Sequence, residues 1–275
     1  MRYDCLISKL LHMSDRAYEA RSRKYLTAEQ VVAWSQCPAL YRQVRAGLPL
    51  HPHNCYRETE LLDAAARIRI LCGRERLEEE YAINGPTNKR IGLPYGRDSA
   101  AFREWAATQT RPALHDDQLV IIEAMAEAVQ KHERARNLLS SGVANGVLAV
   151  EYEGMPCQVR LDYVHPQEGI VHLVMCQYDL YSAQSETRWY PFQYHAAFMC
   201  VLASAVAGTE VPLTLIGILR AAPSQCTMWP LEDPNHYSFA PDARRHVAEM
   251  VRRIATGDMT LPECCSEECR VADLV

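Results

Sequence analysis

Three consecutive β-strand patterns between residues 147 and 176 constrain the fold of this chain more than any other feature. The runs 147–152 and 156–163 flank Glu153-Gly154, a turn signal, and so predict an antiparallel hairpin. Residues 169–176 form an almost unbroken apolar run, which is typical of a strand buried on both faces. The sequence therefore predicts a β meander at the centre of the protein.

Two polar side chains fall within this apolar meander. Asp162 lies at the end of the second strand pattern, and His172 stands alone within the third. Burying a polar group without a hydrogen-bond partner costs roughly 2–7 kcal/mol by transfer estimates. We therefore expect both side chains to meet a partner inside the protein, and the identity of that partner to decide the function.

Helical patterns surround the meander. Thr27 and Gln30 form a capping-box pattern at the start of one helix, and the longest apolar periodicity follows His115-Asp116-Asp117 and ends at Gly142. Further helices are predicted at 58–72, 99–108, 191–208 and 241–256, further strands at 212–220 and 225–231, and irregular structure over the rest of 78–113. This order predicts an α/β (α+β) fold with a central mixed sheet flanked by helices.

We divide the chain into a helical arm (1–25), a single domain (26–262) and a Cys-rich tail (263–275). Apolar residues make up 48% and charged residues 23% of the chain, as in soluble globular proteins. It contains no run of eighteen apolar residues, and its first residues carry an acid where a signal peptide would be basic. We expect a cytoplasmic protein with no membrane partner.

Eleven cysteines are scattered along the chain, and we expect most of them to be small buried hydrophobes. Cys264, Cys265 and Cys269 form the one cluster, which together with Cys37 offers four thiolates for an iron–sulfur centre. Their spacing matches known ligand patterns poorly, so no cofactor is expected there.

The net charge is −5, yet 25 of the 29 basic residues are arginines and no lysine follows Lys131. Arginine suits bidentate contacts with phosphate and carboxylate groups. Four arginines follow one another closely, at Arg67, Arg69, Arg74 and Arg76. They fit a solvated helix face and a phosphate-binding track equally well.

Several stretches resemble the RecE-type exonuclease family (exodeoxyribonuclease VIII and its phage relatives) of the PD-(D/E)XK nuclease superfamily. The resemblance runs from about Leu26 to Pro262 and is carried by 26–42 with its Cys37-Pro38-Ala39, by 76–112 with Phe102 and Trp105, by the helix at 121–129, and by the strand at 156–162. It implies a PD-(D/E)XK core, binding of duplex DNA ends, and a place in phage or prophage recombination or anti-defence. It also makes a homo-oligomer possible, because family members often form rings.

The family's catalytic positions are largely lost in this sequence. The family's early histidine falls at Arg67, its glutamate at Gly146, and the glutamine of its later helix at His195. On the third strand, the expected acid and lysine fall at His172 and Val174.

Only Asp162 and the nearby Arg160 agree with the family pattern. A single carboxylate is a poor ligand set for Mg²⁺, and losing one electrostatic contact to the transition state typically costs about 10²–10³ in rate. The resemblance therefore implies a pseudo-nuclease with Asp162 and His172 as vestigial catalytic positions and no bound metal. Its DNA contacts would be Arg67, Arg69, Arg160 and His195, or its partner would be another protein.

Two other functions stay open on the sequence. One is an active exonuclease that uses Mg²⁺ or Mn²⁺ in a rearranged site built from Asp162, His172 and either Glu151 or Asp179. The other is a pure protein-interaction module, suggested by the negative net charge and the cysteine tail. A softer Zn²⁺ or Mn²⁺ site at Asp162, His172 and His195 is a further alternative, because imidazole suits these ions.

Overall fold

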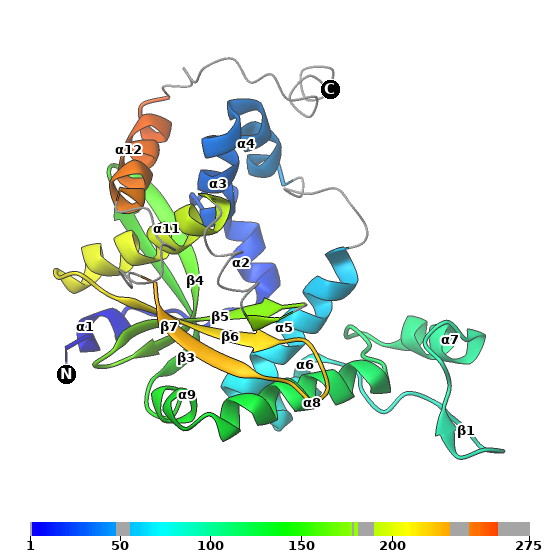
Figure 1. Ribbon diagram of the computed structural model, residues 1–275. Coiled ribbons are helices and arrows are strands. Elements are labelled where there is room, and N and C mark those ends of the chain that lie inside the picture. The colour runs from blue at the N-terminus through cyan, green and yellow to red at the C-terminus, as the bar shows by residue number, and fades with distance from the viewer. Residues whose placement is uncertain (1, 48–55, 178, 181–189, 232–241, 258–275) are drawn as a thin grey trace.

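A five-stranded mixed sheet forms the centre of the protein (Figure 1). The computed structural model describes residues 2–47, 56–177, 179–180, 190–231 and 242–257. The strands follow the chain order: β3 (Val143–Tyr152), β4 (Met155–His165), β5 (Gly169–Cys176), β6 (Leu213–Leu219) and β7 (Cys226–Pro230). Only β5 and β6 run parallel to each other, because α11 (Tyr190–Ala207) lies between them in the chain.

The predicted meander is confirmed. Glu153 and Gly154 both have positive φ, 50° and 76°, and connect β3 to β4 as a tight hairpin turn. The third strand pattern matches β5 in both bounds, and seven of its eight residues are buried. β3 begins at Val143, four residues before the predicted start.

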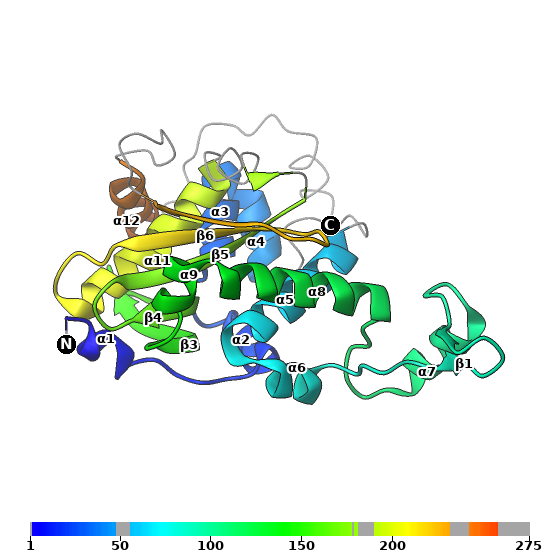
Figure 2. The same cartoon turned by 60° about the horizontal axis from the view of Figure 1, so that its bottom comes forward.

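Helices cover both faces of the sheet and create two apolar cores (Figures 1 and 2). The first core lies under α1 (Asp4–Ile7), α3 (Ala28–Gln36), α4 (Pro38–Arg45), α11 and α12 (Ala243–Ala255). The second lies under α5 (Tyr56–Cys72), α6 (Arg74–Glu80), α8 (Asp116–Lys131) and α9 (Glu133–Leu138). The α/β fold with a helix-flanked mixed sheet is thus confirmed.

The long helix predicted from His115 to Gly142 is wrong in one respect, because it is broken at His132. That residue has φ −82° and ψ 98°, and its Nδ1 accepts a hydrogen bond from the Ala135 amide. A side chain that satisfies a backbone donor in this way favours a new helix start over continuation. The predicted capping box at Thr27 and Gln30 is present at α3.

The stretch 78–113 is more ordered than predicted. A short hairpin of β1 (Thr87–Asn88) and β2 (Leu93–Pro94) precedes α7 (Ala100–Thr108), and both project from the body of the molecule (Figure 1). The two-residue strands are too short to give an alternating pattern in the sequence.

The N-terminal arm is bound to the sheet. Leu11 exchanges two backbone hydrogen bonds of 2.8 Å with Val147 on the edge strand β3, and α2 (Asp15–Arg21) follows. Leu26 then pairs with Cys157 of β4. Figure 2 shows this segment passing along the sheet from α1 to α2, beside α6.

None of the helices in the described ranges combines the length and apolarity needed to cross a membrane. The tail cysteines Cys264, Cys265 and Cys269 lie outside the described residues.

Candidate functional site

The site begins where β4 separates from β5. The two strands pair only between residues 163–165 and 169–171, and Asp162 directly precedes this short ladder. There the Asp162 carboxylate takes the place of a backbone acceptor: its Oδ2 accepts a hydrogen bond from the Leu173 amide at 2.8 Å. Asp162 is only 6% exposed, so the fold holds a carboxylate at the opening between two central strands.

Two further side chains contact the same carboxylate oxygen. Nη1 of Arg67, on α5, lies 2.5 Å from Asp162 Oδ2, and Nδ1 of His172, on β5, lies 2.8 Å from it. Burial alone would raise the pKa of Asp162, but Arg67, His172 and the Leu173 amide together hold that pKa well below its usual range. Asp162 is therefore a buried anion whose charge is compensated by an arginine.

His172 on β5 and His195 on α11, which the sequence grouped with Asp162, both lie at this site. The ring of His172 lies 6.0 Å from those of His195 and Phe192, both on α11. Burial lowers the pKa of His195, which favours its neutral form. Val174, two residues beyond His172 on the same strand, is apolar and buried.

A cavity of about 850 Å³ opens at Asp162. Its walls come from α5, α6, β3, β4, the start of α2 with the segment before it, and residues 111–112. The basic side chains that line it are Arg16, Arg67, Arg76, Arg111, Arg160 and His12, and the acidic ones are Glu79, Glu80 and Asp162. Basic groups outnumber acidic ones around this cavity, in a chain whose net charge is −5.

Arg160 is held over an aromatic ring at this cavity. Its guanidinium carbon lies 5.1 Å from the centroid of the Tyr18 ring, a cation–π arrangement. Tyr18 belongs to α2, and its carbonyl accepts a hydrogen bond of 3.0 Å from Gln158 Nε2 of β4. Burial raises the pKa of Tyr18. The N-terminal arm thus positions a cation of the candidate site, a role the sequence did not predict for it.

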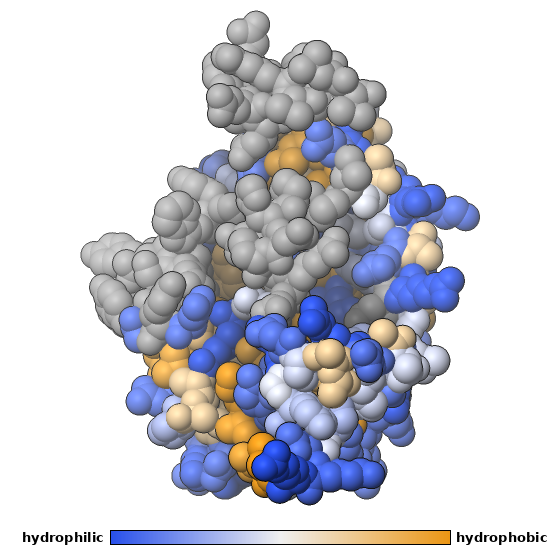
Figure 3. Space-filling view, turned by 90° about the vertical axis from the view of Figure 1, so that its right-hand side faces the viewer, coloured by the Kyte–Doolittle hydropathy of each residue, from blue (hydrophilic) through white to orange (hydrophobic). Residues whose placement is uncertain are grey.

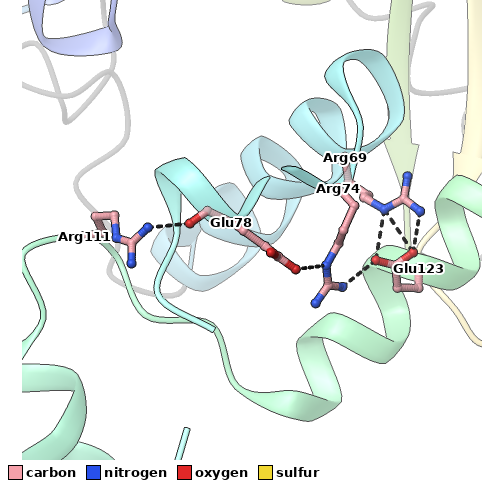
Figure 4. Close-up of polar contacts among 5 residues, drawn as sticks. All are labelled: Arg69, Arg74, Glu78, Arg111 and Glu123. Atoms are coloured by element: carbon pink, nitrogen blue, oxygen red, sulfur yellow. Dashed lines mark hydrogen bonds and ion pairs between the residues drawn. The ribbon is translucent and has the colours of Figure 1, made fainter. Parts of the chain in front are cut away.

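Arg69, predicted as a DNA contact together with Arg67, belongs to a different cluster. It lies two residues farther along α5, and Glu123 of α8 binds both Arg69 and Arg74, at 2.8 Å and 2.7 Å (Figure 4). Arg74 also pairs with Glu78 of α6. Arg69 therefore joins α5 to α8 and does not line the cavity.

Two other arginines that line the cavity, Arg76 on α6 and Arg111 beside that helix, also have partners within the protein. Arg76 pairs with Glu79 at 2.9 Å and Glu80 at 2.6 Å, and it is 54% exposed. Arg111 donates a hydrogen bond to the main-chain carbonyl of Glu78 (Figure 4). Exposed ion pairs of this kind contribute about 0–1 kcal/mol each, so an incoming phosphate can compete for such arginines.

Position 146, where the resemblance placed a glutamate, is closed by the N-terminal arm. A Cβ atom built on Gly146 would lie 2.9 Å from Cδ1 of Leu10. The preceding residue, Asn145, has a φ of 56° and lies opposite Asp162 in the β3–β4 register. Asparagine tolerates this left-handed conformation better than most residues. Asn145 was not singled out in advance as a neighbour of the site, because strand pairing is not visible in the sequence.

The described residues do not fit a divalent metal ion. Among them, no three His, Cys, Asp or Glu side chains gather in an arrangement that could hold one. Mg²⁺ requires oxygen ligands, and one oxygen of the single carboxylate here already accepts hydrogen bonds from Arg67 and the Leu173 amide and lies 2.8 Å from His172 Nδ1. The predicted alternative ligands give no support. Glu151 is exposed and pairs with Pro156 at the hairpin end of β3, and Asp179 is exposed beyond the end of β5.

Comparison with known proteins places this geometry in a family. A profile described as a PDDEXK-like domain of unknown function (DUF3799) matches residues 76–273. No curated protein matches the chain. Among solved structures, the chain is similar to a crystal structure from Eubacterium rectale described as a "putative exonuclease", with a TM-score of 0.60 and 10% sequence identity. The similarity covers 95% of this chain and 93% of that one, and it supports the fold alone.

Proposed function

Since the chain belongs to the PDDEXK-like family DUF3799, we propose that it is a RecE-like nuclease homologue that has lost metal-dependent cleavage and acts by binding DNA. The proposed role is recognition of duplex DNA ends, in phage or prophage recombination or anti-defence. The Arg67–Asp162–His172 contact is the observation that carries this proposal.

The charges around Asp162 support the loss of cleavage. A nuclease of this superfamily uses acidic side chains to hold a divalent cation, which then polarises water and neutralises the phosphate. Here the positive partner of Asp162 is the guanidinium of Arg67. Unlike a metal ion, a guanidinium cannot bind a water molecule as a ligand and polarise it. His172 and Val174 supply neither a second carboxylate nor an ammonium group. A site with this charge arrangement retains an affinity for anions without the means to activate a nucleophile.

The basic lining of the cavity supports DNA as the ligand. Arg16 is exposed at its rim, Arg160 lies over Tyr18, and Arg67 forms part of its floor beside Asp162. Arginine forks match phosphate geometry, and a series of such contacts gives affinity without reading sequence. This basic lining favours a nucleic-acid ligand over the pure protein-interaction module.

Cleavage is tested by incubating the protein with linear duplex DNA that carries a label at either end. The buffer contains about 10 mM MgCl₂ or MnCl₂, to saturate weak carboxylate sites. We expect no digestion above a buffer control, and the same result for Asp162→Ala. If the wild-type protein digests the DNA with either metal and Asp162→Ala does not, the proposal is overturned in favour of the active-exonuclease alternative.

Binding is tested by fluorescence anisotropy with the same duplex at several salt concentrations. We expect the Arg16→Gln/Arg160→Gln double variant to lose about tenfold in affinity at low salt and to reduce the slope of log Kd against log salt by about two. Arg134→Gln/Arg136→Gln on α9, outside this cavity, is the matched control and should behave like wild type. Failure of the wild-type protein to bind DNA even at low salt would leave the protein-interaction module as the better account.

A further inference from the structure

The β1–β2 hairpin carries exposed apolar and basic side chains together. Ile91 and Leu93 are 61% and 60% exposed, although burying such a side chain stabilises a protein. The hairpin also carries Lys89 and Arg90, both exposed, and no acidic residue occurs from Tyr81 to Arg97. An exposed apolar and basic tip of this kind indicates a contact surface.

The hairpin is held in place by a built structure. In its turn, the amides of Ile91 and Gly92 both donate to the Asn88 carbonyl, and the Arg90 amide donates to Asn88 Oδ1 at 2.9 Å. Gly92 has a φ of 69°, which glycine adopts without strain. The tip therefore has a defined shape and is not a loose loop.

A small aromatic cluster anchors the base of the hairpin. Phe102 of α7 lies 5.0 Å from the ring of His115 and 5.5 Å from that of Trp105. Nε2 of His115 lies 2.8 Å from the carbonyl oxygen of Tyr95, just after β2. The apolar side chains that this segment buries are thus at its base, whereas Ile91 and Leu93 are left at its tip.

The cations of the tip also differ from most arginines of the neighbouring helices. Arg69, Arg74 and Arg76 are each paired with glutamates, as described above. Within the part of the chain that the structure describes, Lys89 and Arg90 make no ion pair. Their charge is therefore available to an external anion.

The partner that fits these features is duplex DNA. A two-stranded β-ribbon fits the major groove, phosphates flank either groove, and apolar side chains next to lysine or arginine pack against base edges or steps. A protein partner is less well matched, because the described part of the surface on this side is mostly hydrophilic, with apolar side chains gathered in separate patches (Figure 3). Stable protein interfaces generally have a larger apolar centre.

We propose that the β1–β2 hairpin is a second DNA-contacting element, in which Lys89 and Arg90 contact phosphates and Ile91 and Leu93 enter a groove of the duplex. The inference deepens the proposed DNA-binding function and rests on it. It adds a contact that lies outside the Asp162 cavity, since none of these four residues lines that cavity.

The test compares two hairpin variants of the full chain by fluorescence anisotropy with a labelled duplex. Lys89→Gln/Arg90→Gln should weaken binding about 5- to 20-fold at low salt and lower the salt slope by about two, the effect of losing two phosphate contacts. Ile91→Ser/Leu93→Ser should weaken binding several-fold with an unchanged salt slope, because no charge is lost. Thermal unfolding of both variants should match wild type, since all four side chains are exposed.

Matched controls separate the hairpin from general surface effects. Arg23→Gln/Lys24→Gln removes an adjacent pair of exposed cations elsewhere, and Val120→Ser removes an apolar side chain of α8 that is 60% exposed. Both should leave DNA binding unchanged. If wild type binds DNA and the hairpin variants bind equally well, the hairpin proposal is overturned and the cavity proposal stands.

If wild type binds no DNA, both proposals fail together. Two further outcomes would overturn the hairpin proposal alone: hairpin-dependent binding to vesicles of anionic phospholipid with no effect on DNA affinity, or a hairpin-dependent dimer in analytical ultracentrifugation.

Discussion

At the scale of single residues, Asp162 is a buried carboxylate held by two side chains from other elements. It lies at the opening between β4 and β5, where Arg67 and His172 contact it. A buried ion pair of this kind contributes little net stability relative to apolar residues, whereas removing one partner leaves an uncompensated charge. Arg67 therefore compensates the charge of Asp162 within the protein, as the proposed loss of metal-dependent cleavage requires.

The pH dependence of stability tests this account. Because the folded-state pKa of Asp162 lies below its unfolded value of about 4, the unfolded chain binds the additional proton, and stability falls as pH drops below about 4. We expect Asp162→Asn to lower the free energy of unfolding at pH 7 by about 2–4 kcal/mol, somewhat less than is usual for breaking a fully buried pair, since Arg67 keeps some exposure. That deficit should shrink by about 1.4 kcal/mol per pH unit below pH 4.

The measurement is urea denaturation of both proteins between pH 3 and pH 7. Glu104→Gln, which removes an exposed carboxylate on α7, should follow wild type throughout. A deficit in Asp162→Asn that is the same at pH 3 and pH 7 would contradict the assignment of Asp162 as the ionised, arginine-bound group.

At the scale of elements, the N-terminal arm shapes the candidate site more than its sequence suggests. It pairs with the edge of β3 through Leu11 and covers Gly146 with Leu10. It then places Tyr18 under Arg160 and contributes Arg16 to the cavity. The arm thus fills space that a side chain at position 146 would otherwise occupy.

A double-mutant cycle between Leu10 and Gly146 measures this packing. Gly146→Ala should destabilise the protein by about 1–2 kcal/mol, because the new methyl group would contact Leu10 at 2.9–3.1 Å. The same substitution made in a Leu10→Ala background should cost much less. Gly96→Ala, at a glycine with nothing within 4 Å, is the control and should be nearly neutral. Additive effects of the two changes would show that Leu10 does not restrict position 146.

At the scale of the whole molecule, one sheet separates two apolar cores. Leu202 of α11 and Leu148 of β3 belong to one core, and Ile122 of α8 and Leu173 of β5 to the other. Adjacent residues of β5 alternate between the two cores, so the same strand stabilises both. This sharing favours the prediction that residues 26–262 form a single domain.

Core truncations test the single-domain prediction. Ile122→Ala and Leu202→Ala each remove a fully buried side chain and should each lower the free energy of unfolding by about 2–5 kcal/mol. In both variants, tryptophan fluorescence and far-UV circular dichroism should report one coincident transition, moved to lower denaturant. Two separate transitions, of which each variant moves only one, would divide the chain into independent units.

The sequence by itself determined the local structure: the meander at 147–176, the capping box of α3, and the amphipathic helices on either side of the sheet. These features follow from residue spacing and short-range hydrogen bonds, so they are visible without coordinates. The family resemblance also predicted the PD-(D/E)XK core, which the fold confirms.

Only the tertiary structure decided which groups meet. Arg67 and Asp162 are 95 residues apart in the chain. They meet because α5 passes the place where β4 and β5 separate. Arg69, two positions away, is directed to Glu123 because successive residues of a helix point in different directions. The break at His132 and the projecting hairpin likewise depend on single hydrogen bonds and short turns, which leave no periodic signal in a sequence.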